Sequence, residues 1–395
     1  HLMGTKVYAP DLNTIRKMRN NNISTLLISP GAINVFRTNK DFQDALLAEG
    51  IHIYMPTTQE WNRNEQQQLK EVSIEDLLPR DEISIDMESV GSMLHGKRIL
   101  ITGSAGSIGS EMVRQIAKYS PAELILIDSA ETPQHDIRLM MAKQFPDIKA
   151  ETIVTTICSK SRMKHIFKTY LPDYVFHAAA YKHVPMMENN PCESIQNNVY
   201  GTKILADLAV KYGVKKFVMI STDKAVNPTN VMGCSKRICE IYVQSLNKAI
   251  EEGIINGKTQ FVTTRFGNVL GSNGSVIPLF KKQIKAGGPV TVTDPRIIRY
   301  FMLIPEACKL VLEAGTKGNG GEIFVFDMGK PVKIADMAQR MINLSGAKNV
   351  EIKYTGLRAG EKLYEEVLNE KESTKPSFHD KIRIAEVREY DYTEV

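Results

Sequence analysis

The feature that most constrains the fold of this chain is a regular alternation of apolar and amphipathic segments between residues 97 and 266. The apolar segments read "KRILITG", "AELILID", "TIVTTI", "DYVFHAAA", "KKFVMIST" and "TQFVTTRFG", and segments with helical periodicity separate them. Strands that are apolar throughout are buried on both faces, and helical crossovers make neighbouring strands parallel. The pattern therefore predicts an α/β fold with a doubly wound parallel sheet.

The rest of the chain divides around this alternation. Residues 1–60 carry a shorter α/β pattern, which we interpret as a truncated N-terminal nucleotide-fold-like domain. Residues 61–96 are polar and charged, as is typical of a linker, with one short helix expected at "SIEDLL". We expect the main domain at 97–274. The looser pattern of 275–395 predicts a smaller α/β region that binds substrate.

Composition is that of a soluble globular protein and argues against several partners. Of the 395 residues, 24% are charged and 43% hydrophobic, and the net charge is +5. No basic run interleaved with aromatic residues is present, so no nucleic-acid partner is expected. No segment approaches the about 18 apolar residues that span a bilayer. The five cysteines form no CxxC pair, which favours free thiols in a reducing compartment, and no metal site is expected.

A glycine turn, "ITGSAGSIGSE", joins the first strand of the alternation to its helix. Gly103 allows a tight turn, Gly106 lets the backbone approach a pyrophosphate, and Gly109 lets the helix pack closely on the strand. The N–H groups at the start of the helix then face the phosphates. Asp128 ends the next strand, where a carboxylate accepts hydrogen bonds from both hydroxyls of an adenosine ribose. The sequence therefore predicts a Rossmann-like domain that binds NAD rather than NADP.

The stretch "STDKAVNPTNVMGCSK" places reactive side chains at the end of a later strand. Thr222 lies at the carboxyl end of that strand, where ligands bind in open α/β sheets. Met232 and Lys236 are four residues apart on the following helix and share one face, which we expect to lie against the nicotinamide ribose. Lys236 can hold the ribose hydroxyls. The thioether of Met232 cannot exchange a proton.

Asp223 and Lys224 are two adjacent titratable groups with opposite charge. An elimination needs a base to remove a carbon-bound proton and an acid to protonate the leaving hydroxyl. As base, Lys224 requires a lowered pKa, which burial and the nearby Lys236 are expected to provide. As acid, Asp223 requires a raised pKa, which desolvation by a bound sugar would provide. The alternative is a simple turn with a capping aspartate and a solvated lysine.

Two sets of motifs resemble a known superfamily and one branch of it. The glycine spacing and "FHAAA" resemble the extended short-chain dehydrogenase/reductase superfamily. "TDKAVNPTNVMGCSKR" resembles the membrane-associated, long-form UDP-N-acetylglucosamine 4,6-dehydratases of bacterial polysaccharide and glycan biosynthesis, which carry methionine where the soluble 5-inverting enzymes carry tyrosine. The resemblance covers about residues 70–395.

The resemblance implies tightly bound NAD, a UDP-sugar substrate and a UDP-4-keto-6-deoxy-N-acetylhexosamine product with retained configuration at carbon 5. It also implies a homo-oligomer. The full-length protein is expected at the cytoplasmic face of the bacterial inner membrane, anchored by segments absent from this chain, which is itself expected to be soluble.

The same resemblance assigns residues to the site. The catalytic set is Thr222, Asp223, Lys224, Met232 and Lys236. The cofactor set is Gly103, Ser104, Gly106, Ser107, Ile108, Gly109, Asp128, Thr156, Ile157, Ala178, Ala179 and Lys236. Thr156 and the Ile157 backbone replace an aspartate that such proteins often place beside the adenine. The substrate set is Lys182, His183, Asn198, Arg265, Asn268, Ser275, Arg299, Arg358 and Glu361, in which arginines suit a diphosphate and glutamate suits ribose hydroxyls.

Two other functions remain open at this stage. A UDP-sugar 4-epimerase would leave Asp223 and Lys224 without a task and would lack its proton acceptor at Met232. A nonenzymatic nucleotide-sensing module would have no use for the catalytic set. The acceptor of the proton on the 4-hydroxyl of the sugar is also open, with three candidates: Thr222, Asp223, and a water relayed to Lys236.

Overall fold

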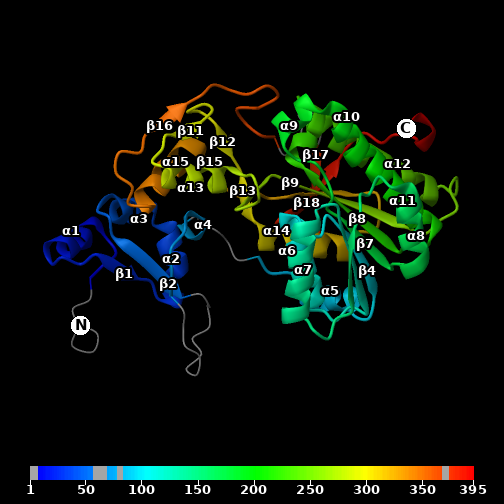
Figure 1. Cartoon of the computed structure of the whole chain (residues 1–395), viewed down its shortest axis with the longest axis horizontal. Helices are drawn as coiled ribbons and strands as arrows, with labels where there is room; N and C mark the ends of the chain where they lie inside the picture. The colour runs from blue at the N-terminus through cyan, green and yellow to red at the C-terminus, as the bar shows by residue number, and fades with distance from the viewer. Residues whose placement is uncertain (1–7, 57–68, 78–82, 367–372) are drawn as a thin grey trace. The chain divides into compact units, whose positions relative to one another are not determined.

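The computed structural model describes residues 8–56, 69–77, 83–366 and 373–395. The chain forms two compact units (Figure 1). The first unit lies within residues 1–82, 274–297 and 332–356, and the second within 83–273, 298–331 and 357–395. The region 275–395, expected to be one substrate-binding region, therefore contributes to both units.

The first unit combines the start of the chain with two later segments. Its sheet contains β1 (Thr25–Leu27), β2 (His52–Pro56) and β3 (Leu69–Glu71), with β1 parallel and β3 antiparallel to β2. Its helices are α1 (Leu12–Asn20), α2 (Ile33–Thr38), α3 (Lys40–Ala48), α4 (Ile74–Leu77), α13 (Val276–Lys285) and α15 (Ile334–Leu344). Parallel strands β11 (Val290–Val292) and β16 (Ile352–Tyr354) complete it. An ion pair of 2.7 Å between Arg340 Nε and Asp44 Oδ1 joins α15 to α3.

The second unit is built on a nine-stranded sheet with the order β17-β18-β14-β9-β8-β7-β4-β5-β6. The strands are β4 (Arg98–Thr102), β5 (Glu123–Asp128), β6 (Ala150–Val154), β7 (Tyr174–His177), β8 (Lys216–Thr222), β9 (Gln260–Phe266), β14 (Ile323–Phe326), β17 (Ser373–Pro376) and β18 (Ile382–Glu386). All neighbours from β14 to β6 are parallel, and β18 is antiparallel to β14 and β17. The predicted Rossmann-like parallel sheet is confirmed.

Helices cover both faces of this sheet (Figure 1). One face packs against α5 (Met87–Leu94), α6 (Ser107–Ala117), α7 (Glu131–Gln144) and α14 (Ile304–Lys317). The other packs against α8 (Lys160–Tyr170), α11 (Gly201–Lys211) and α12 (Val231–Glu251). Within β4, Ile99 and Ile101 join the first core, whereas Leu100 joins the second. Alternate side chains point to opposite faces, so a strand buried on both sides is apolar throughout.

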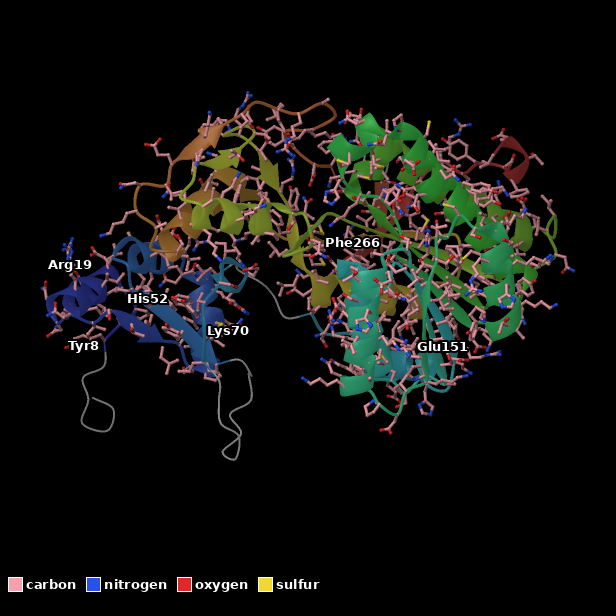
Figure 2. The ribbon with its side chains drawn as sticks, in the orientation of Figure 1. Tyr8, Arg19, His52, Lys70, Glu151 and Phe266 are labelled. Atoms are coloured by element: carbon pink, nitrogen blue, oxygen red, sulfur yellow. The ribbon has the colours of Figure 1, made fainter. Side chains whose placement is uncertain are left out.

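Aromatic packing fills the core close to the carboxyl end of β9. Phe266, labelled in Figure 2, stacks on Phe326 with ring centroids 5.5 Å apart and planes 6° from parallel. Both rings are almost fully buried. The packing fixes the end of β9, immediately before the site residue Asn268.

Two boundaries differ from the predictions. The strand expected at "TIVTTI" lies at Ala150–Val154, so Thr156 and Ile157 follow it instead of ending it. The helical segment predicted between "DYVFHAAA" and "KKFVMIST" contains a π-helical segment at Ile195–Tyr200, between α10 (Pro191–Ser194) and α11. Such segments widen one turn of a helix and are frequent at functional sites. Among the helices of the described residues, none is long and apolar enough to cross a membrane.

Candidate active site

The glycine turn after β4 is closed so tightly that two of its glycines have no room for a side chain. Gly103 has φ of +66°, and an added Cβ would lie 2.7 Å from the Ala179 nitrogen. A Cβ on Gly109 would lie 1.9 Å from the Gly103 carbonyl oxygen. Gly106 is the N-cap of α6 and has no side chain to cap the helix. The first N–H groups of α6 therefore suit an external acceptor such as a pyrophosphate.

Asp128, Ser104 and Ser107 support this turn through hydrogen bonds. The Asp128 carboxylate accepts from the backbone nitrogens of Ala105 at 3.0 Å and Ala130 at 2.9 Å. Ser104 is buried and donates from Oγ to the side chain of Gln134 at 2.9 Å. Ser107 Oγ accepts from a backbone nitrogen at 3.1 Å. Asp128 thus shapes the turn, and its binding of a ribose remains a prediction.

The other predicted cofactor residues follow the neighbouring strands at the same edge of the sheet. Ala178 and Ala179 come after β7, and both nitrogens donate to Thr102 of β4, at 3.2 and 3.3 Å. Thr156 and the buried Ile157 come after β6. The carboxyl ends of β6, β5, β4 and β7 are adjacent, which is the edge where α/β sheets bind dinucleotides. Ile108 lies in the first turn of α6, partly buried against the core.

Helix α12 brings Met232 and Lys236 close to the end of β8. A Cβ on Gly233 would lie 2.2 Å from the Lys224 carbonyl oxygen, so a glycine allows this approach. Met232 and Lys236 are 2% and 5% exposed. Burial lowers the pKa of Lys236. Burial, aided by the charge of Lys236, lowers the pKa of His177 to about 3.

Lys236 fits a site for a ribose. No hydrogen bond or ion pair reaches its ammonium group from the described part of the chain, although the side chain is buried. The charge of Glu240 acts on this ammonium group, and ribose hydroxyls would supply acceptors for its N–H groups. The glycine turn, the strand edge and Lys236 together fit an NAD molecule.

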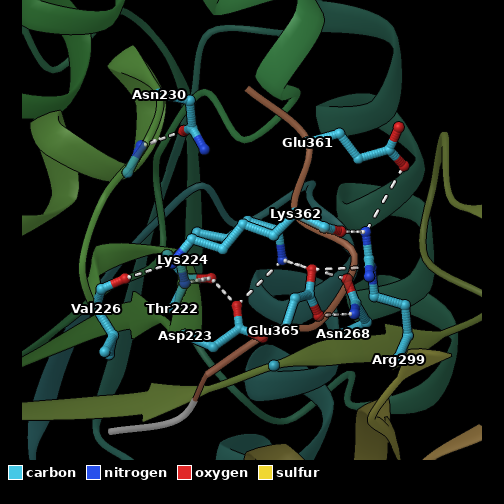
Figure 3. A network of polar contacts seen from close by, with 12 residues as sticks. Thr222, Asp223, Lys224, Val226, Asn230, Asn268, Arg299, Glu361, Lys362 and Glu365 are labelled. Atoms are coloured by element: carbon cyan, nitrogen blue, oxygen red, sulfur yellow. Dashed lines mark hydrogen bonds and ion pairs between the residues drawn. The ribbon is translucent and has the colours of Figure 1, made fainter. Parts of the chain in front are cut away.

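Thr222, Asp223 and Lys224 form a compact cluster where β8 ends (Figure 3). Asp223 is 2% exposed. Its Oδ1 accepts from Thr222 Oγ1 at 2.9 Å and from Lys224 Nζ at 3.1 Å. Its Oδ2 is buried and has no hydrogen-bond partner among the described residues. Asp223 and Lys224 are therefore not a solvated turn.

Glu365 is a fourth member of the cluster that the sequence analysis missed. Its Oε1 lies 2.8 Å from Lys224 Nζ and 3.1 Å from Arg299 Nε (Figure 3). Its Oε2 accepts from Asn268 Nδ2 at 2.6 Å. The only sequence signal is a pair of glutamates in "KLYEEVL", where one is buried and Glu366 is exposed. Asn268, predicted from the resemblance, is thus placed in the cluster.

The pKa of Lys224 contradicts the expectation of a lowered value. Burial lowers the pKa of this lysine, but the carboxylates of Asp223 and Glu365 together outweigh burial and raise it above the ordinary value. The expectation was wrong because it did not include Glu365. Burial raises the pKa of Asp223 to about 6, with the charge of Glu365 adding to the rise and that of Lys224 opposing it. The pKa of Asp223 is thus raised by the protein itself, whereas the prediction attributed the rise to a bound sugar.

Lys182 and His183 follow β7, and Asn198 lies in the π-helical segment after them. Lys182 Nζ donates to Ser272 Oγ at 3.4 Å. Loss of hydration and the charge of Lys224 lower the pKa of Lys182, and loss of hydration and the charge of Lys182 lower that of His183. Asn198, in the π-helical segment, accepts from the Tyr181 nitrogen at 2.8 Å and donates to its oxygen at 3.0 Å. Asn198 thus holds the backbone at Tyr181, and its contact with a substrate remains a prediction.

Arg265 and Arg299 differ from their predicted role as phosphate ligands. Arg265 is fully buried in β9, and its Nη2 lies 2.8 Å from Glu240 Oε2, so it is not accessible to a nucleotide. The prediction considered only its charge, whereas β9 is an inner strand of the sheet. Arg299 donates to the carbonyls of Leu363 at 3.0 Å and Lys362 at 2.7 Å, so it anchors the segment that carries Glu365.

The remaining predicted substrate residues occupy two places. Arg358 is exposed, and its nitrogen donates to Glu361 Oε2 at 3.2 Å. Glu361 Oε1 lies 3.6 Å from Arg299 Nη2. Ser275 belongs to the first unit, at the N-cap of α13. The binding roles of Arg358, Glu361 and Ser275 remain predictions.

A parallel sheet with this glycine turn is the architecture of dinucleotide-binding α/β proteins. The relatives of the chain place it in the nucleotide-sugar dehydratase and epimerase class of extended short-chain dehydrogenases/reductases. Residues 99–387 match the family of polysaccharide biosynthesis proteins, and the chain belongs to that family.

Two curated relatives and one solved structure illustrate the similarity. The capsular polysaccharide biosynthesis protein CapD of Staphylococcus aureus is 49% identical over 88% of this chain and 58% of its own length. This chain thus spans little more than half of that relative. A UDP-N-acetylglucosamine 4,6-dehydratase (inverting) of Campylobacter jejuni is 36% identical over 71% of this chain and 80% of its own length.

The solved structure is the dTDP-glucose 4,6-dehydratase DesIV of Streptomyces venezuelae, with NAD and TYD bound. It has 22% identity and a TM-score of 0.59, over 67% of this chain and 86% of that one. At this identity the likeness supports the fold.

Proposed function

We propose that this chain is an NAD-dependent UDP-N-acetylglucosamine 4,6-dehydratase that retains the configuration at carbon 5 and serves polysaccharide or glycan biosynthesis. The observation that carries the proposal is the Asp223–Lys224 pair at the carboxyl end of β8, in which a buried carboxylate lies 3.1 Å from a partly buried ammonium group. A dehydratase needs an acid and a base in one place, and this pair supplies both. The relative from Campylobacter jejuni supports the substrate class.

NAD is supported by the glycine turn, by the adjacent strand ends and by Lys236, whose side chain is 5% exposed and whose N–H groups suit ribose hydroxyls. When bound, NAD would accept a hydride from carbon 4 of the sugar and return it to carbon 6. Lys236 would hold the nicotinamide ribose, and the N-terminus of α6 would hold the pyrophosphate. Residues 358–361 would contribute to binding the UDP portion.

Thr222 and Asp223 are best suited to take the proton of the 4-hydroxyl. Met232 cannot take it, and Thr222 Oγ1 already donates to Asp223 Oδ1 at 2.9 Å. A 4-hydroxyl that donates to Thr222 would pass its proton through that oxygen to Asp223. With a pKa of about 6, Asp223 is ionised at neutral pH, accepts this proton and then gives it to the departing 6-hydroxyl. The proton leaves in the water that is eliminated.

Lys224 would act as the base that removes the proton from carbon 5. The same amine would return the proton to carbon 5 after the hydride reaches carbon 6. A single base on one face of the sugar restores the original configuration, which is consistent with the expected retention. Anchoring at a membrane and homo-oligomer formation remain part of the proposal.

One incubation tests the function. The purified chain is mixed with UDP-N-acetylglucosamine without added cofactor, and the sugar is followed by NMR. A new 6-methyl signal is expected. A galacto isomer instead would identify a UDP-sugar 4-epimerase, and an unchanged sugar would favour a nonenzymatic nucleotide-sensing module.

A labelled substrate tests the internal hydride transfer. With deuterium on carbon 4 of the sugar, the label should appear on carbon 6 of the same molecule. Loss of the label to solvent would contradict the mechanism. An unlabelled substrate in heavy water is the matched control for exchange at carbon 5.

A further inference from the structure

Glu365 touches the acid/base pair directly but has no task in the reaction described so far. It is buried, and one of its oxygens lies 2.8 Å from Lys224 Nζ. It is held from two further sides, by Arg299 Nε at 3.1 Å and by Asn268 Nδ2 at 2.6 Å. A buried carboxylate with three fixed partners is rigidly placed.

The segment that carries Glu365 is attached to the loop after β8. Lys362 Nζ donates to the Val226 oxygen at 3.1 Å (Figure 3), and the Gly360 oxygen accepts from Asn230 Nδ2 at 3.3 Å. Asn230 is the N-cap of α12, the helix of Met232 and Lys236. Glu365 is therefore positioned by the same loop that carries the catalytic pair.

Proton counting leaves a gap that this geometry can fill. Lys224 carries a proton in the structure, because it is paired with two carboxylates. It must lose that proton before it can take one from carbon 5. Asp223 cannot accept it, because Asp223 already holds the proton of the 4-hydroxyl when the elimination begins. Glu365 is the other carboxylate in contact with Lys224 Nζ.

We propose that Glu365 stores the proton of Lys224 while this lysine acts as base, an inference that rests on the proposed dehydratase function. Lys224 gives one proton to Glu365 and becomes a neutral amine. The amine removes the carbon 5 proton while Asp223 protonates the departing 6-hydroxyl. After the hydride reaches carbon 6, Lys224 returns its proton to carbon 5 and recovers the stored proton from Glu365. All charges then equal those of the starting state.

Charged groups from several segments determine whether the shared proton resides on Lys224 or on Glu365. Arg299, 3.1 Å from Glu365, favours its ionised form, which returns the proton to Lys224 at the end of each cycle. Glu365 is thus a positioning residue that acts through Lys224. The titratable and charged groups around the pair are Lys182, Asp223, Arg299, Glu361 and Lys362.

Glu365→Gln removes the storage site and keeps the size of the side chain. We expect turnover to fall about 100-fold, as for loss of a proton-transfer group. The KM for the UDP-sugar and the amount of bound NAD should change little. The melting temperature should fall, because Lys224 and Arg299 lose a buried ion-pair partner, so turnover is measured well below it. In heavy water, exchange at carbon 5 should fall together with turnover. Glu366→Gln is the control, because this neighbouring glutamate is exposed and should retain full turnover.

The pH profile separates storage of a proton from a structural role. In Glu365→Gln, Lys224 must lose its proton to solvent, so the remaining turnover should rise with pH above neutrality, where the wild type is level. Glu365→Asp keeps a carboxylate and should keep the wild-type profile, at a lower rate. A uniform loss of turnover with an unchanged profile in Glu365→Gln would overturn the proposal. Absence of a 6-methyl product from the wild type would instead overturn the dehydratase function itself.

Discussion

The cofactor turn and the acid/base cluster lie at the same edge of one sheet but are built in opposite ways. The turn is formed by backbone atoms and glycines. A Cβ added to Gly103 or to Gly109 would lie within 3 Å of neighbouring backbone atoms. The cluster uses buried charges from three distant parts of the chain, at Asp223 and Lys224, at Arg299, and at Glu365. The turn therefore depends on the absence of side chains, and the cluster on their mutual compensation.

The largest expected effect belongs to the cluster. In Lys224→Ala the base is lost, and product formation should fall about 1000-fold, within the range for acid–base catalysis. The cofactor turn is untouched, so NAD should remain bound. NMR of the sugar and the nucleotide released on denaturation measure the two effects. Lys281→Ala is the matched control, because that lysine is exposed and belongs to the other unit. Robust turnover in Lys224→Ala would refute the role of Lys224 as the base.

A change in the turn should instead reduce the amount of bound NAD. A Cβ in Gly109→Ala would lie 1.9 Å from the Gly103 oxygen, so the turn must open. Such overpacking costs about 1 to 3 kcal/mol, which corresponds to an about tenfold to hundredfold loss of NAD retention. Gly31→Ala has no atom within 4 Å of its added Cβ and is the control. Unchanged NAD content in Gly109→Ala would contradict the predicted role of the turn.

Gly267 tests whether the cluster also depends on a missing side chain. In Gly267→Ala, the added Cβ would lie 2.8 Å from Asp223 Oδ2 and displace the carboxylate. We expect turnover to fall about tenfold, because small misplacements of a catalytic group are costly. NAD content should not change. Equal losses of NAD and turnover would indicate that the two regions are not independent.

The smallest expected effect is a gain in stability on removal of a catalytic charge. Folding raises the pKa of Asp223 from 3.8 to about 6, so the folded state binds more protons between these values. The stability of the wild type therefore falls as pH rises through this window. Asp223→Asn should be more stable than the wild type by about 1 to 3 kcal/mol at pH near 8, and the gain should vanish at pH near 4.

Chemical denaturation at both pH values measures this difference. Lower stability of the Asn variant at high pH would show that the ionised aspartate is favourable to folding. Its turnover should be lost at all pH values, because an amide can neither accept nor donate the required proton.

The sheet and the turn could be predicted from sequence because their signals are local. Strands such as "RILIT" are apolar on both faces, and the turn occupies seven consecutive residues from Gly103 to Gly109. The apolar pattern of a strand and the glycine spacing of the turn each lie within the element that they predict.

The cluster could be predicted only in part, because its charges depend on contacts between distant residues. Asp223 and Lys224 are adjacent and were identified, but Glu365 carries no motif and meets them only in the folded chain. Without it, the direction of the Lys224 pKa was wrong. Arg265 was assigned to substrate binding for the same reason. Its ion pair with the buried Glu240 depends on the fold and could not be read from the sequence.

The first unit shows a third kind of limit. The α/β pattern of residues 1–60 was predicted, but the packing of these residues with α13 and α15 was not. Hydrophobic periodicity identifies the buried face of a helix but not the segment that covers it.

The position of Glu365 along the chain has a consequence for biosynthesis. A ribosome releases the glycine turn and six parallel strands, β4 to β9, well before it reaches Glu365. Lys224 therefore lacks its second carboxylate partner until the segment that carries Glu365 has been synthesised. The acid/base cluster is thus among the last parts of this unit that the growing chain can complete.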